Sequence, residues 1–170
     1  GRVERTVSST APYFLGLETG GTKATAAVLD HEHNQLATRE AARPAGATAQ
    51  DTISQLIELG RAVQTDAGLE NPPDAIGWGF GGPVDRQQNK PAYNFHESGW
   101  DQLETNPATQ LEAALHAPVY VENDCEVAGL AEAHLGAGST EGLTFYMTLG
   151  SGVGGGLIWN GRILASGPLG

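Results

Sequence analysis

Residues 16–23, Gly-Leu-Glu-Thr-Gly-Gly-Thr-Lys, decide how the start of this chain folds. The apolar run 13–17 precedes the glycine pair, and a β-tolerant apolar run, 24–29, follows it. Two such runs around a polar Gly-Gly corner predict a hairpin-like turn. Glycine there lets backbone N–H groups face one concavity that attracts an anion, with the Thr22 hydroxyl and the Lys23 charge beside it. The octet alone is equally consistent with a plain tight hairpin.

The 170-residue chain is acidic, with a formal net charge of −11 and a single cysteine, Cys125. This charge disfavours nucleic acid or an anionic membrane surface as the main partner. One cysteine allows no intrachain disulfide and no cysteine zinc cluster. No apolar run approaches the roughly 20 residues of a spanning helix, and residues 1–12 contain no apolar signal-peptide region. We therefore expect a soluble, cytoplasmic protein.

Alternating strand and helix signals predict an α/β fold. The expected strands are 13–18, 23–30, 35–41, 75–80, 118–122 and 143–149, with two strand halves in 157–164. The expected helices are 51–67, with Asp51 as N-cap, one opening at Asn106-Pro107, and one running from 124 to about 135. A composition change near Ala117 divides the chain into a flexible tail over 1–12, an α/β domain over 13–117, and the opening part of a second α/β domain over 118–170.

A second glycine-rich stretch, Gly-Ser-Gly-Val-Gly-Gly at 150–155, fits the G-x-G-x-x-G pattern. That pattern indicates a dinucleotide site only if a helix opens from the glycines and an acidic residue follows about 20 positions later. The residues that follow alternate like a hairpin instead, which disfavours this interpretation. The chain also lacks the G-x-x-x-x-G-K-[ST] pattern of a P-loop. We therefore interpret this stretch as a second glycine turn between two strands. Two such turns can bind a polyphosphate from two sides, with Mg²⁺ neutralising part of its charge.

Asp124 lies where the strand 118–122 ends and a helix begins. A single carboxylate at this position is explained most simply as a helix cap. Its neighbour Asn123 supports a second interpretation, because an amide and a carboxylate at the carboxyl end of a strand suit holding a polyol and removing a hydroxyl proton. The residues alone leave both interpretations open.

Taken together, five segments resemble the ROK family (repressors, open reading frames and sugar kinases) of the hexokinase–actin–heat-shock ATPase superfamily. They are LGLETGGTKATAAVLD (15–30), GWGFGGPVD (77–85), YNFHESGW (93–100), PVYVENDCEVAGLAEAHLGAG (118–138) and FYMTLGSGVGGGLIWNGRIL (145–164). They follow the order and spacing of the family and cover most of 13–170. The resemblance implies a ribonuclease-H-like ATPase fold, with the second domain incomplete.

The resemblance also implies ATP-dependent phosphorylation of a hexose, in the manner of a glucokinase or fructokinase, with ATP and Mg²⁺ as cofactors. Asp124 would be the general base, and Asn94 and Asn123 would contact the sugar with it. The phosphate-binding residues it implies are Gly20, Gly21, Thr22 and Lys23 in the first turn and Thr148, Gly150, Ser151 and Gly152 in the second. Such phosphoryl transfer depends mainly on positioning and charge neutralisation.

Several positions depart from the family pattern. Glu18 stands where an aspartate is usual, Gly81 where proline is frequent, Cys125 where alanine is frequent, and Glu126 where asparagine is frequent. Glu18 is one methylene longer than aspartate, so metal or water coordination beside it is expected to shift.

The family continues beyond a position equivalent to Gly170 with a sugar-holding glutamate and histidine, a Cys/His zinc motif and the adenine pocket. We therefore expect zinc only in a longer parent chain, and expect 1–170 alone to be inactive. Exposed strand edges would be covered by a second copy or by a missing C-terminal half. Two alternatives are a noncatalytic sugar- or nucleotide-binding module and a sugar-responsive transcription regulator, which would need a DNA-binding segment ahead of the first strand, where only 12 residues stand.

Overall fold

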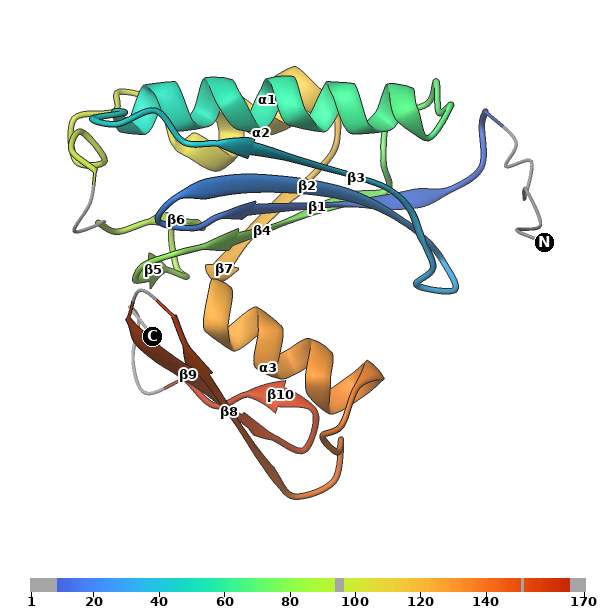
Figure 1. Cartoon of the computed structure of the whole chain (residues 1–170), viewed down its shortest axis with the longest axis vertical. Coiled ribbons are helices and arrows are strands. Elements are labelled where there is room, and N and C mark those ends of the chain that lie inside the picture. The colour runs from blue at the N-terminus through green and yellow to red at the C-terminus, as the bar shows by residue number, and fades with distance from the viewer. Residues whose placement is uncertain (1–8, 94–96, 151, 166–170) are drawn as a thin grey trace.

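A computed structural model describes residues 9–93, 97–150 and 152–165, which form a five-stranded sheet and a three-stranded sheet joined through a helix, and a small two-stranded sheet (Figure 1). The elements in chain order are β1 (Tyr13–Thr19), β2 (Lys23–Asp30), β3 (Gln35–Ala42), α1 (Ala49–Asp66), β4 (Ala75–Phe80), β5 (Val84–Asp85), β6 (Lys90–Pro91), α2 (Pro107–Leu115), β7 (Val119–Asn123), α3 (Asp124–Leu135), β8 (Leu143–Leu149), β9 (Val153–Trp159) and β10 (Arg162–Ile163). The predicted α/β class is confirmed.

The larger sheet has the strand order β3-β2-β1-β4-β7. Its first three strands form an antiparallel meander, whereas β4 runs parallel to β1 and β7 parallel to β4. Alternate residues of β1 are buried, because successive side chains of a strand point to opposite faces. They meet the apolar stripe of α1, where Ile53, Leu56 and Val63 have no exposed surface. Figure 1 shows α1 and α2 on the same face of this sheet.

The start of α1 differs from the prediction. The N-cap is Thr48, with extended backbone angles (φ −87°, ψ 169°), and not Asp51. Asp51 is the third helical residue and completes a capping box, since its carboxylate accepts a hydrogen bond from the Thr48 N–H at 2.9 Å. The helix therefore begins two residues earlier than predicted. The predicted cap of α2, Asn106 followed by Pro107, is confirmed.

The smaller sheet has the order β10-β9-β8 and lies against α3. Gly154 to Gly156 belong to β9 and not to a turn, so the predicted turn is shorter than expected. The glycines allow β9 to approach α3 closely. A Cβ added at Gly154 would lie 2.4 Å from the Cys125 Sγ, and one at Gly156 would lie 2.9 Å from the Glu126 Cα.

The predicted domain boundary after Ala117 does not coincide with the division between the sheets. β7 lies beyond that boundary, yet it completes the five-stranded sheet by pairing with β4. Val119 and Val121 are buried in the core of that sheet, which explains why β7 belongs there. The second sheet begins only after α3. Most of the predicted tail, 1–12, lies outside the described residues.

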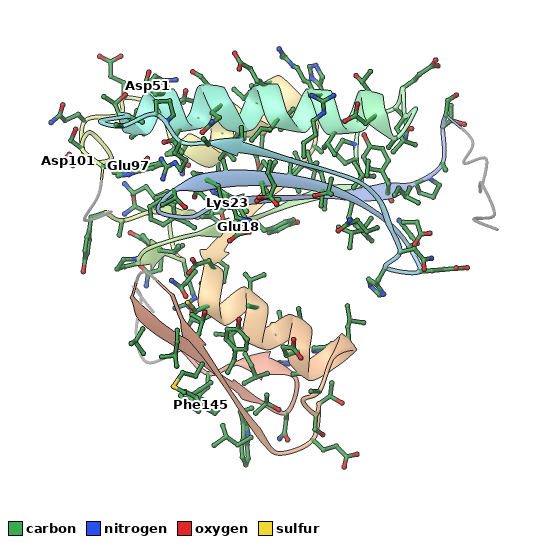
Figure 2. The ribbon with its side chains drawn as sticks, viewed as in Figure 1. Glu18, Lys23, Asp51, Glu97, Asp101 and Phe145 are labelled. Carbon is green, nitrogen blue, oxygen red and sulfur yellow. The ribbon has the colours of Figure 1, made fainter. Side chains whose placement is uncertain are left out.

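The outer face of the smaller sheet is apolar and exposed. Along β8 the side chains that point away from α3 are Leu143, Phe145, Met147 and Leu149, and Phe145 is 63% exposed. Figure 2 shows Phe145 on the side of the sheet away from α3. Val153, Leu157 and Trp159 of β9 are exposed as well. We name these seven residues the apolar face; contiguous exposed apolar side chains of this kind often mark a surface that contacts other protein.

Candidate functional site

The carboxyl ends of three parallel strands meet at one edge of the larger sheet. Thr19 of β1 is in register with Phe80 of β4, and Phe80 is in register with Asn123 of β7. Ligands of open α/β sheets bind in the crevice outside such carboxyl ends. The first glycine turn, Asp124 and the loop that follows Phe80 all begin here, so this edge is the candidate site.

The first glycine turn comprises residues 20–22, between β1 and β2. The Gly20 N–H donates to the Lys23 carbonyl at 3.0 Å and closes the turn. Neither Gly20 nor Gly21 has a left-handed φ, and a Cβ at Gly21 would meet nothing within 4 Å. The backbone of Gly21 is thus open to a ligand because it lacks a side chain, and not because the turn needs an unusual φ.

The base of this turn is rigid and adjoins Asp124. The Gly81 N–H donates to the Thr19 carbonyl at 3.1 Å. Thr19 is fully buried, and its hydroxyl accepts a hydrogen bond from the Trp78 Nε1 at 3.1 Å. A Cβ added at Gly81 would lie 3.5 Å from the Asp124 Oδ2 and 3.9 Å from the Gly20 Cα. Gly81 therefore lies between the first glycine turn and Asp124, and its lack of a side chain allows the two to lie close together.

Asn123, and not Asp124, caps α3. The Asn123 Oδ1 accepts hydrogen bonds from the N–H groups of Cys125 (3.0 Å) and Glu126 (3.2 Å), and its Nδ2 donates to the Gly82 carbonyl at 3.1 Å. Asp124 is the first residue of the helix, and its Oδ1 accepts from the Cys125 N–H at 2.8 Å. The Asp124 Oδ2 lies on the side of Gly81 and the first glycine turn, and the Cys125 thiol also interacts with this carboxylate.

The second glycine turn, 150–152, joins β8 to β9. It lies near the first residues of α3, because Gly154 of β9 packs on Cys125. The Gly150 N–H donates to the Gly152 carbonyl at 2.9 Å, whereas Ser151 lies outside the described residues. Thr148 and Gly154 face each other across β8 and β9, and Gly154 packs on Cys125. Figure 1 shows both glycine turns at the same end of the molecule. The structure thus brings both turns to the residues around Asp124.

Lys23 does not point its charge into the first turn. Its Nζ forms an ion pair with the Glu40 Oε2 on β3 at 2.6 Å, and this hydrogen bond raises the pKa of Lys23.

Glu18, which Figure 2 shows beside Lys23, lines a cavity of about 460 Å³ together with Asp124. This cavity therefore brings two carboxylates together beside the first glycine turn. Asn94 lies outside the described residues.

Sequence reasoning missed a charged network behind Asp124. The Arg86 guanidinium donates to both Glu122 oxygens at 2.8 Å and also pairs with Glu126. Burial and the nearby Glu122 carboxylate raise the pKa of Glu126, although Arg86 opposes this. Burial and Asp124 raise the pKa of the Cys125 thiol to about 11, which makes it a packing residue and not a nucleophile. Glu122 and Glu126 lie 36 and 40 positions after Arg86, so no local sequence pattern predicts that they contact it.

Over residues 9–93, 97–150 and 152–165, no group of three or more His, Cys, Asp or Glu side chains is arranged to hold a metal ion. No helix in these same ranges is long and apolar enough to cross a membrane.

Comparison with known proteins identifies relatives among sugar kinases. The model of the ROK family matches residues 14–170. A fructokinase from Lactococcus lactis subsp. cremoris is 32% identical over 158 residues, which cover 89% of this chain and 48% of that protein. A solved ROK hexokinase from Thermus thermophilus has a TM-score of 0.75 at 32% identity, covering 89% of this chain and 48% of that one.

A ROK family glucokinase from Streptomyces griseus, solved in complex with glucose and AMPPNP, has a TM-score of 0.74 at 30% identity. The match covers 89% of this chain and 46% of that one. The chain thus spans about half the length of the relatives it matches. The family model covers nearly all of the chain, and the fold is the actin/hexokinase ATPase fold of these relatives, of which the chain covers about half. This chain belongs to the ROK family.

Proposed function

We propose that the protein containing this chain transfers the γ-phosphoryl group of ATP to a hydroxyl of a hexose, as a glucokinase or fructokinase does. The observation that carries the proposal is the position of the Asp124 Oδ2 at the carboxyl ends of the parallel strands, next to Gly81 and the first glycine turn. The relatives support the reaction class by their names, and the AMPPNP complex of one glucokinase supports ATP as the donor.

Asp124 would act as general base. The Cys125 N–H fixes its Oδ1, so Oδ2 is directed outward to take the proton from the sugar hydroxyl as that hydroxyl attacks phosphorus. Proton removal and attack would then occur at the carboxyl ends of β1, β4 and β7, where the reacting groups are held in place.

The phosphates of ATP would bind the backbone N–H groups of the first turn and, across the start of α3, the second turn. Gly20, Gly21, Thr22, Thr148, Gly150, Ser151 and Gly152 are the residues proposed for this role, with Lys23 contributing long-range charge from its pair with Glu40. Glu18 would help to hold Mg²⁺, which when bound neutralises phosphate charge, and Asp124 would stay free to act as the base.

The sugar would contact Asp124, Asn94 and Asn123. Because the Asn123 Oδ1 already accepts two backbone hydrogen bonds, its contact with sugar would come through the second hydrogen of Nδ2. The main role of Asn123 is then to fix the start of α3, and hence the position of Asp124.

The apolar face would be covered by another part of the protein or by a second copy of the chain. Seven apolar side chains on one face of a three-stranded sheet are exposed to water, which is unfavourable. Such a surface is usually buried against other protein. We propose that residues 1–170 alone associate and do not phosphorylate sugars, and that the reaction takes place in the cytoplasm, where ATP is available. Light scattering of the 170-residue chain tests this association; a monodisperse monomer active on hexoses contradicts it.

The decisive experiment replaces Asp124 by asparagine in the protein encoded by the complete reading frame. Glucose, fructose, mannose and N-acetyl sugars are assayed with ATP, and the variant is expected to retain sugar binding while turnover on the best sugar falls about 10²- to 10⁴-fold. Near-normal turnover would show that Asp124 is structural. Sugar binding without any phosphorylation by the parent protein would instead favour the noncatalytic module, and specific DNA binding would favour the regulator.

A further inference from the structure

A buried ion pair lies directly behind the first glycine turn. The side chains of Arg43, which follows β3, and Glu97 form this pair and are only 5% and 4% exposed. Burying two charges is costly, and a buried ion pair is often no more stabilising than an apolar pair of similar volume. This pair therefore requires an explanation other than stability.

Arg43 holds the turn from two sides. Its Nη1 donates to the Gly20 carbonyl at 2.9 Å, and its backbone N–H donates to the Thr22 carbonyl at 3.0 Å. In a trans peptide the C=O and the following N–H point in opposite directions. Since the Gly20 carbonyl points inward to Arg43, the N–H of Gly21 points outward, to the side where a Cβ would meet nothing within 4 Å.

Glu97 holds Arg43 in place and is itself held by α1. The Thr52 hydroxyl donates to the Glu97 Oε1 at 2.7 Å, and the Trp100 Nε1 donates to its Oε2 at 3.2 Å. The Ala49 N–H donates to the Ser98 carbonyl at 3.0 Å, which fixes the same segment to the start of the helix. Figure 2 shows Glu97 close to this end of α1, near Asp51.

We infer that Arg43, held by Glu97, is a positioning residue that directs the Gly21 N–H toward the phosphates of the nucleotide. The inference rests on the proposed function for the identity of the anion, while the orientation of the turn is a property of the chain itself. The guanidinium also places a positive charge behind the turn, balanced by Glu97 so that the buried site as a whole stays neutral.

The test replaces both charges together, because a single replacement would leave an unpaired buried charge. The double variant Arg43→Met with Glu97→Leu is compared with Arg39→Met, which removes an exposed ion pair between Arg39 of β3, four residues before Arg43, and Asp66 of α1. In the protein from the complete reading frame, affinity for ATP is expected to fall roughly 10- to 100-fold, the value of one charge-assisted hydrogen bond. Affinity for adenosine, which has no phosphate, and the KM of the sugar are expected to stay within about twofold.

A second readout separates the inference from the proposed function. The Gly20 N–H is hydrogen-bonded within the turn, so its hydrogen exchange reports on the order of the turn without any nucleotide. The double variant is expected to exchange this proton at least tenfold faster, while amides in the middle of α1 keep their protection. A parent protein that binds no ATP would refute the proposed function and leave this readout intact. Unchanged Gly20 exchange, unchanged ATP affinity, or equal losses for ATP and adenosine would each overturn the inference.

Discussion

Substituting Gly81 by alanine tests the junction between the first glycine turn and Asp124. The added Cβ would lie 2.8 Å from the Thr19 carbonyl oxygen, closer than real Cβ atoms approach such an atom. Thr19 cannot move aside easily, because it is fully buried, is paired along β1 and accepts a hydrogen bond from Trp78. The backbone must therefore shift where the strand ends.

Overpacking of this kind costs about 1–3 kcal/mol. For a protein of this size each kcal/mol lowers the Tm by about 2–4 °C, so the expected loss is about 2–12 °C. Gly77 is the matched control, since it lies in β4 and a Cβ there would meet nothing within 4 Å. Thermal unfolding followed by circular dichroism, with urea titrations beside it, measures both variants. If Gly81→Ala unfolds within a degree of Gly77→Ala, the contact is not a constraint and the geometric reasoning is wrong.

Two further substitutions separate the roles of single residues. Gly21→Val is expected to leave Tm nearly unchanged, because the space at Gly21 is open, but to lower ATP affinity by filling the place of the anion; calorimetric titration with ATP measures this, and an unchanged affinity would exclude the turn from phosphate binding. Glu126→Gln tests the raised pKa of this carboxyl, whose ordinary value is 4.5. A carboxyl whose pKa is higher in the folded state loses stability as pH rises from 4.5 through that raised pKa, so the free energy of unfolding of the Gln variant is expected to rise relative to that of the parent over this interval. Urea midpoints across this range measure the gain, and a difference that shrinks with rising pH contradicts it.

The sequence predicts well those features that depend on neighbouring residues. The hairpin around Gly20, the helix α1 and the α2 start at Asn106-Pro107 follow from periodicity and capping chemistry, and the structure has all three. The N-cap was misplaced by three residues, since both Thr48 and Asp51 are good capping residues and the capping box uses both.

Features that depend on pairing between distant segments were missed. Glu97 meets Thr52 across 45 positions, and Arg86 meets Glu126 across 40. Neither pair leaves a local pattern in the sequence. Gly154 and Gly156 look like turn residues locally, and only their contacts with Cys125 and Glu126 explain why they lie inside a strand. The roles of the candidate site residues remain predictions.

The passage of the chain from one sheet to the other, at Asn123 and Asp124, has a mechanical consequence. β7 belongs to the larger sheet, whereas α3 lies against the smaller one, so a rotation of one sheet relative to the other would pivot near this step. In a small rotation, displacement grows with distance from the axis. The tip of the β8–β9 turn would travel far while the carboxylate of Asp124 stayed almost still. In such a rotation the proposed base would keep its position relative to a sugar hydroxyl, while the second glycine turn would move relative to the first.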